Sequence, residues 1–261
     1  MPIGKCKLCL LERDLCESHA LPHSLFNYAL RQSAGKVVAL TNDEATFNQH
    51  SSDTWQTFLF CAGCEDKLNQ NYDRYGMGVF RGVYATITPS AAGVTFKGIN
   101  RSHLRMFFLS VLWRISVSKH EAYRNIDLPY PLEDELHSAI VEERKVANPH
   151  FAVRLHRLRD STGTPGLTNE KLRGLVIAPE ARQQDGFKSI YFLCLGFVVE
   201  ISLTGFPKKY LAQSGVLAGS SPVFMAPYWE VRDFPPITAT LAQGLKKHDA
   251  GLTRIRVGRD A

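Results

Sequence analysis

The feature of this sequence that most constrains its fold is a pair of Cys-x-x-Cys motifs. The first is Cys6-Lys-Leu-Cys9 and the second is Cys61-Ala-Gly-Cys64. Two intervening residues allow both thiolates of a motif to face one ion, and two such motifs complete the tetrahedral sulfur shell that suits zinc. We therefore predict that these four cysteines bind one structural Zn²⁺, with roughly the first seventy residues folded around it.

The cellular compartment decides whether closely spaced cysteines bind metal or form disulfides. The N-terminus enters the first motif at once and shows no charged start followed by an apolar run, so we predict no secretory signal and a cytoplasmic protein. Free buried cysteines and a redox pair are the alternatives to zinc. Cys16 is a substitute ligand with the wrong spacing for a knuckle, and Cys194 lies in an apolar stretch typical of a core strand.

Composition limits the broad class of the protein. The chain has 261 residues, of which 44% are hydrophobic and 21% charged, as in globular proteins with a hydrophobic core. The most apolar stretches, 106–117 and 190–203, contain charged residues and are shorter than the roughly 20 apolar residues that cross a bilayer. We therefore expect no membrane partner. The formal net charge of +6 is compatible with a nucleic-acid partner but does not establish one.

Hydrophobic periodicity predicts an α+β fold with three regions: a zinc-binding module (1–76), short strands and two helices (77–148), and a β-rich region with a C-terminal helix and basic tail (149–261). The β-rich part is expected to be antiparallel. We predict helices at 101–120, 133–146 and 237–247. We predict two strands within 77–98 and further strands at 150–158, 172–178, 188–195, 197–203 and 221–225. Gly196 marks either a bulge in one strand or a bend between two.

The segment between the cysteine motifs carries the candidate active site. It contains Ser18-His19-Ala-Leu-Pro22, and Glu65 directly follows the last cysteine. A cysteine pair, this segment, and a second pair that opens a helix resemble the HNH endonuclease family over about residues 6–75. The resemblance implies a treble-clef module, in which a ββα hairpin is wrapped on metal, and hydrolysis of DNA phosphodiesters.

The resemblance also implies roles for individual residues. His19 matches the general base that takes a proton from the attacking water. A catalytic Mg²⁺ or Mn²⁺, distinct from the zinc, would stabilise the leaving oxygen, because a four-cysteine zinc has no open position. Ser18 stands where the family has an Asp or His ligand, and Glu65 where it has a His; a carboxylate is an acceptable Mg²⁺ ligand. Gln56 is nearest to the family's middle Asn.

Several other residues are candidates for contacts with nucleic acid. His23 lies one helical turn after His19 and is a spare ligand or a phosphate contact. Lys67 and Arg74 follow the second cysteine pair, and Arg101 and Arg105 are one turn apart on a predicted helix. The default for Arg101 and Arg105 is a solvated helix face, and for the segment with Lys67 and Arg74 it is a helix end whose aromatic residues pack against the zinc module. No Gly-rich phosphate loop is present, so we predict no small-molecule cofactor.

Two functions therefore compete. The first is an HNH-like, metal-dependent endonuclease acting on DNA, with defence against phage or other foreign DNA as its context. The second is a non-catalytic zinc module that binds nucleic acid or a partner protein. An activating or assembly partner is compatible with both, and a structural subunit is a third class. Both central residues also have a structural interpretation. His19 would bond a backbone carbonyl or a thiolate near the zinc, and Glu65 would place a negative charge at a helix N-terminus, where it complements the dipole.

Overall fold

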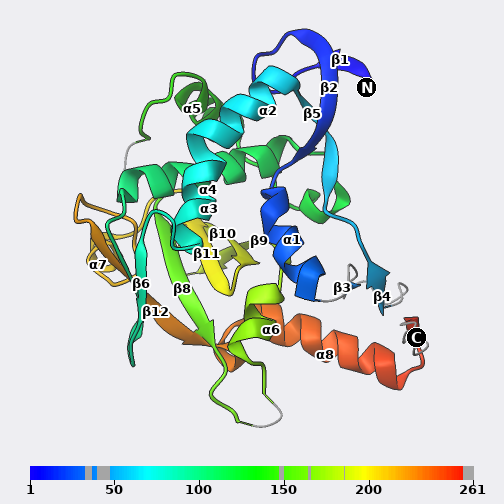
Figure 1. The fold of residues 1–261 in the computed structure, drawn as a ribbon, viewed down its shortest axis with the longest axis vertical. Coiled ribbons are helices and arrows are strands. Elements are labelled where there is room, and N and C mark those ends of the chain that lie inside the picture. Colours follow the sequence, from blue (N-terminus) through cyan, green and yellow to red (C-terminus); the bar gives the residue numbers. More distant parts are fainter. Residues whose placement is uncertain (33–36, 40–47, 147–149, 164–165, 185, 255–261) are drawn as a thin grey trace.

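A computed structural model describes residues 1–32, 37–39, 48–146, 150–163, 166–184 and 186–254 (Figure 1). The fold is α+β, as the sequence predicts. Among the described residues, no helix combines the length and apolar character needed to cross a membrane.

The N-terminal part is a three-stranded antiparallel sheet followed by helices. Its strand order is β1-β2-β5, with α1 beginning directly after Pro22 and α2 directly after Cys61. A short second sheet, β13-β4-β3, joins the C-terminal end of the described chain to this part. The elements are β1 (Ile3–Lys5), β2 (Glu12–His19), α1 (His23–Gln32), β3 (Val37–Ala39), β4 (Asn48–Ser51), β5 (Gln56–Cys61), α2 (Ala62–Leu68) and β13 (Thr253–Arg254).

The two strands predicted within 77–98 are present as β6 (Thr86–Pro89) and β7 (Gly93–Lys97), but the first residues of that range are helical. The helix that starts with α2 continues through a π-helical segment, η1 (Asn69–Asp73), into α3 (Arg74–Phe80), so Met77–Phe80 are helical. Valine and aromatic residues made this segment resemble a strand, but it is part of a packed helix: a Cβ on Gly76 would clash with the Phe107 ring. The glycine therefore lets α3 approach the neighbouring helix closely.

The central element is α4 (Arg101–Val117), which the sequence predicted with nearly these bounds. Its residues from Leu104 to Ile115 are all buried. Trp113 stacks on Phe60 of β5 at 5.7 Å between ring centroids, and Phe108 meets Phe192 of the large sheet at 6.4 Å. The helix is apolar nearly all round because it is covered on both sides, by the N-terminal sheet and by the large sheet.

The large sheet has seven strands in the order β6-β7-β12-β8-β11-β10-β9. All neighbours are antiparallel except β12 and β8, which are parallel. Leu195 and Gly196 have φ angles of 53° and 74° and form a tight turn, so β10 and β11 are two strands and not one bulged strand. The strands are β6 (Thr86–Pro89), β7 (Gly93–Lys97), β8 (Val153–Arg159), β9 (Ile177–Gln184), β10 (Phe187–Cys194), β11 (Phe197–Ser202) and β12 (Val223–Glu230).

The remaining helices differ in part from the prediction. The predicted strand at 172–178 is wrong at its start, because Thr168 accepts a hydrogen bond from the Lys171 N–H and caps a short helix there. The helix predicted at 133–146 begins earlier, with Pro131 in its first turn, and ends earlier. These helices are α5 (Tyr130–Val141), α6 (Asn169–Gly174), α7 (Lys208–Leu211) and α8 (Pro235–Asp249), with short 3-10 turns η2 (Glu121–Tyr123) and η3 (Val231–Asp233).

The hydrophobic core does not follow the three predicted regions. One cluster of buried residues runs from Cys6 to Ala226 and includes side chains from all three regions. A second cluster lies on the other face of the large sheet, under α6 and α8, which lie at the bottom of Figure 1. Residues 255–261 of the predicted basic tail lie outside the described residues, and Lys247 is buried in α8.

A buried histidine predicts acid lability. His156 of β8 packs on Trp229 at 4.8 Å, and its Nδ1 is buried without a hydrogen-bond partner. Burial, with a smaller contribution from Arg154, lowers the pKa of His156 to about 3. The unfolded chain has a His pKa of about 6.5 and binds the proton first, so stability is full above that pH and falls as the pH drops toward 3.

The measurement is urea unfolding at about pH 7 and about pH 5. We expect His156→Phe to lose less stability than the wild type between the two pH values. An equal loss in both proteins would remove His156 as a source of the acid lability.

Candidate metal centre

The four cysteines of the two motifs converge at one point. Their sulfur atoms all lie within 4.8 Å of one another, and all four are free thiols. Four sulfurs bound at about 2.3 Å to one tetrahedral ion lie roughly 3.8 Å apart, so the observed cluster needs only a small contraction to close on zinc. Cys6, Cys9, Cys61 and Cys64 could therefore hold a zinc ion, and a shell of four soft sulfur ligands fits it.

Local backbone contacts build this cluster. The Cys6 N–H donates to the Leu11 carbonyl at 2.9 Å, and the Leu10 N–H donates to the Cys6 carbonyl at 3.0 Å. Leu10 has a φ of 61°, which turns the chain back into β2 after Cys9. The His137 side chain of α5 donates to the Leu8 carbonyl at 2.8 Å and braces the turn from outside. The first motif is thus a knuckle held on both sides.

Hydrogen bonds to sulfur favour the thiolate at Cys6. The Cys61 N–H donates to the Cys6 Sγ at 3.4 Å. Burial acts to raise the pKa of Cys6, but main-chain hydrogen bonds from Cys61, Cys9 and Leu8 outweigh it and lower the pKa to about 7. Burial raises the pKa of Cys9 and of Cys64. A bound cation would be needed to hold all four groups as thiolates.

Beside the cysteines lies a closed polar cluster made by Ser18, Glu65, Asp73 and Arg114. Ser18 is fully buried, and the Glu65 Oε2 is buried with no hydrogen-bond partner. Burial raises the pKa of Glu65, while the nearby Arg114 charge and a hydrogen bond with the Ser18 side chain act in the opposite direction. The two residues predicted as ligands of a catalytic cation are therefore in contact with each other.

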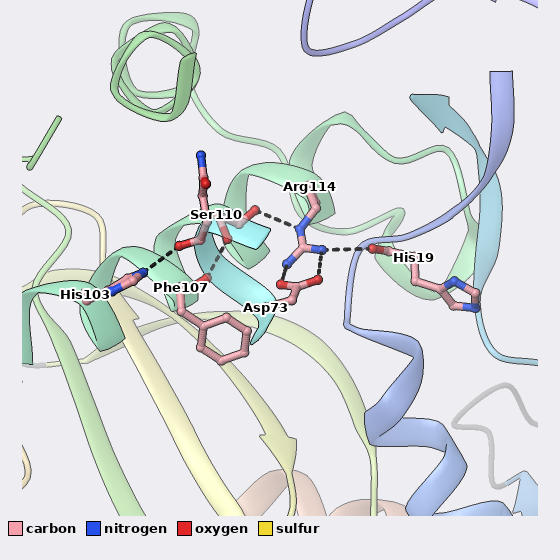
Figure 2. Close-up of polar contacts among 7 residues, drawn as sticks. His19, Asp73, His103, Phe107, Ser110 and Arg114 are labelled. Atoms are coloured by element: carbon pink, nitrogen blue, oxygen red, sulfur yellow. Dashed lines mark hydrogen bonds and ion pairs between the residues drawn. The ribbon is translucent and has the colours of Figure 1, made fainter. Parts of the chain in front are cut away.

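Arg114 supplies the positive charge of this cluster. Its guanidinium is bidentate on Asp73, at 2.8 and 2.6 Å, and it also donates to the main-chain oxygens of His19 and Ser110, both at 3.3 Å (Figure 2). The side chain of Arg114 is 2% exposed. The nearby Arg114 charge would repel a divalent cation beside Glu65, and one of the two carboxylate oxygens is already buried.

The His19 ring lies on the other side of the strand. Successive side chains of a strand point to opposite faces, so the buried Ser18 and His19 diverge. The His19 Nε2 is 2.9 Å from the Thr54 Oγ1, and the ring stacks on His23 at 4.7 Å. Figure 2 shows this ring directed away from Arg114. Burial, and then the charges of His23 and Arg114, lower the pKa of His19 to about 4, so the imidazole is neutral near pH 7.

Gln56 and His23 accompany His19 on this face. Gln56 is exposed and directly opposite His19 in the β2–β5 register, which places the two side chains on one face. His23 is exposed and begins α1, as expected from a chain that turns helical after Pro22. We call His19, His23, Thr54 and Gln56 the histidine face. Thr54 was missed by sequence reasoning, because no spacing rule connects it to His19.

Lys67 and Arg74, two of the residues predicted to contact nucleic acid, differ in their surroundings. Lys67 donates to the Val141 carbonyl at 3.0 Å and pairs with Glu143 at 3.2 Å, so it holds the end of α5. Arg74 is exposed and forms no side-chain hydrogen bond or ion pair with any described residue.

Neither arginine at the start of α4 lies on a solvated helix face. Arg101 donates to the Ala218 carbonyl at 2.7 Å and to the Val223 carbonyl. Arg105 is 6% exposed and donates to the Phe151 carbonyl at 3.4 Å. The default expectation for these two residues is therefore corrected, because the loop before β12 and the start of β8 pack over the N-terminal end of the helix.

Besides Thr54, the sequence did not identify Arg114 and Asp73 as site residues. Arg114 was visible as a charge that interrupts an apolar helix, which is the signal of a buried, paired group. Its partner could not be found from sequence, because Asp73 is 41 residues away. Comparison with family models, curated proteins and solved structures finds no match to this chain.

Proposed function

We propose that this protein binds DNA through an N-terminal module of HNH type, held together by a structural zinc ion, and that it does not cut the DNA. The layout that supports a treble clef is a cysteine knuckle, the antiparallel pair β2–β5 and then α2, with the second cysteine pair at the start of that helix. The zinc would stabilise the module and take no part in chemistry, because four thiolates leave no open position.

The observation that carries the non-catalytic part is the closed cluster. Glu65 stands at the position of the family's metal-binding His, yet its Oε2 is buried and Arg114 lies beside it. A guanidinium there supplies the positive charge that a cation would bring, without an open coordination position for a phosphate oxygen or water. The His19 ring faces the opposite side of β2. Base and carboxylate therefore do not face one substrate.

The binding part is supported by charge and exposure. The formal net charge is +6, and Arg74 of α3 is exposed and forms no side-chain hydrogen bond or ion pair with a described residue. The histidine face presents His23 and Gln56 at the surface, and amide and imidazole groups are common contacts to phosphate and sugar oxygens. Sequence-independent affinity of this kind comes mainly from basic side chains and weakens with salt.

The test measures binding of a short fluorescent DNA duplex by fluorescence anisotropy. The salt concentration is varied between about 50 mM and 200 mM in the presence of Mg²⁺ or Mn²⁺. We expect binding that weakens steeply with salt and leaves the duplex intact. Arg74→Glu should weaken binding and reduce the slope of log K against log salt by about 1.

The matched control for Arg74→Glu is Lys171→Glu, which changes the charge equally at an exposed position of α6. It should bind like the wild type. Absence of any DNA binding at the lowest salt, or equal weakening by both variants, would overturn the proposal.

The second candidate function is DNA cleavage with His19 as general base. Three observations favour it: His19 is neutral near pH 7, is hydrogen-bonded to Thr54 and lies opposite the exposed Gln56. In the same assay, cleavage by the wild type that disappears in His19→Ala would establish this candidate and reject the non-catalytic one. Cleavage that persists in His19→Ala would remove His19 from the reaction.

A further inference from the structure

A pocket of about 650 Å³ opens at the N-terminal end of α4. Its wall includes Asn100, Arg101, Ser102, Arg105 and Lys145, and no acidic residue lines it. The first turn of α4, the segment after α5 and the loop before β12 form this wall, so three distant parts of the chain meet there. A volume of this size is typical of small-molecule sites.

Two of the cations at this pocket are not neutralised. Arg101 gives its hydrogen bonds to the main-chain carbonyls of Ala218 and Val223, and it forms no ion pair with any described residue. Its Nε is buried and has no hydrogen-bond partner. Lys145 is exposed and likewise forms no ion pair within the described part of the chain. The pocket therefore carries positive charge that an anion would balance.

Arg105 adds a buried cation to the wall. It is 6% exposed and donates to the main-chain carbonyls of Phe151 and His150. Burial lowers its pKa, and Glu135 acts in the opposite direction. A buried guanidinium in a cavity wall is a strong donor to phosphate oxygens, because its field is little screened there.

The helix end completes the site. Asn100 caps α4 by accepting a hydrogen bond from the His103 N–H. The N–H groups of Arg101 and Ser102 belong to the first helical turn and have no intrahelical partner. The 17-residue helix directs the positive end of its dipole at the same place.

We propose that this pocket binds the phosphate monoester of a nucleotide. The cations and the free N–H groups of α4 would hold the phosphate, while Ile99, Val146 and Leu217 give the wall an apolar part for the nucleoside. The same phosphate chemistry is offered by a free mononucleotide and by the 5′-phosphorylated end of a DNA strand. The site is separate from the metal centre and does not depend on the function proposed for it.

The experiment measures binding of four probes to the full-length protein by calorimetry: a nucleoside 5′-monophosphate, its nucleoside, a 5′-phosphorylated oligonucleotide and the same oligonucleotide with a 5′-hydroxyl. We expect the phosphorylated member of each pair to bind more tightly, by about tenfold or more. Tighter binding of the mononucleotide identifies a free nucleotide as the ligand, and tighter binding of the phosphorylated strand identifies a strand end.

Two variants test the location. Lys145→Glu reverses an exposed charge, and Ser102→Asp places a carboxylate in the first turn of α4, where it suits the helix dipole but repels phosphate. Each variant should weaken binding of the phosphorylated probe about tenfold or more, while the midpoint temperature of thermal unfolding stays unchanged or rises. Lys171→Glu is the control and should bind like the wild type.

Equal binding of phosphorylated and unphosphorylated probes would overturn the proposal. So would unchanged affinity in both Lys145→Glu and Ser102→Asp. The outcome of the duplex-binding test with Arg74→Glu does not affect this test, because binding of a mononucleotide requires only the pocket.

Discussion

Replacing Cys9 or Cys64 with serine is expected to release the metal and unfold the N-terminal module. Each change removes one of four sulfur ligands that lie within 4.8 Å of one another. Because a structural zinc contributes its binding free energy to folding, we expect zinc content to fall from one ion per chain to none and the midpoint of thermal unfolding to fall by roughly 10 °C or more. Elemental analysis and calorimetry measure both quantities on the same samples.

The chain supplies a matched control in Cys16. Its Sγ donates to the Phe60 carbonyl at 3.1 Å, and a serine hydroxyl can make the same contact. Cys16→Ser should keep its zinc and unfold within a few degrees of the wild type. A wild-type protein without zinc, or full zinc retention in Cys9→Ser, would contradict the metal assignment and remove the basis for an HNH-type module.

Replacing Arg114 with leucine is expected to cost about 3–5 kcal/mol of folding free energy, which corresponds to a fall of roughly 6–20 °C in the unfolding midpoint. The change leaves Asp73, whose side chain is 13% exposed, without its bidentate partner. It also removes the donor to the His19 carbonyl that joins the end of β2 to α4. Urea unfolding gives the free energy directly.

Two further variants make this prediction specific. The double variant Arg114→Leu with Asp73→Leu should recover much of the loss, because an apolar pair can replace a buried ion pair at little cost. Arg124→Leu breaks an exposed pair with Glu121 and should cost no more than about 1 kcal/mol. If Arg114→Leu and Arg124→Leu cost the same, the closed cluster does not stabilise the protein, and its role in excluding a cation loses support.

Local sequence patterns predicted a good part of the secondary structure. The broad apolar face of 101–120 identifies α4, because helical periodicity acts within a few residues. The same rules failed where tertiary contacts decide. Met77–Phe80 contain valine, phenylalanine and a glycine, yet they are helical in α3, where Gly76 lets the helix pack closely on Phe107.

By itself, the sequence determined the candidate metal ligands, since two thiolates spaced by two residues can face one ion whatever surrounds them. It also determined that His19 and Glu65 flank that centre. Only the tertiary structure decided that Ser18 meets Glu65 while His19 points away, and that Arg114 closes the cluster over Asp73. The physical reason is distance along the chain: Arg114 lies 41 residues from Asp73 and 95 from His19, and only the packing of α4 brings their charges and carbonyls together.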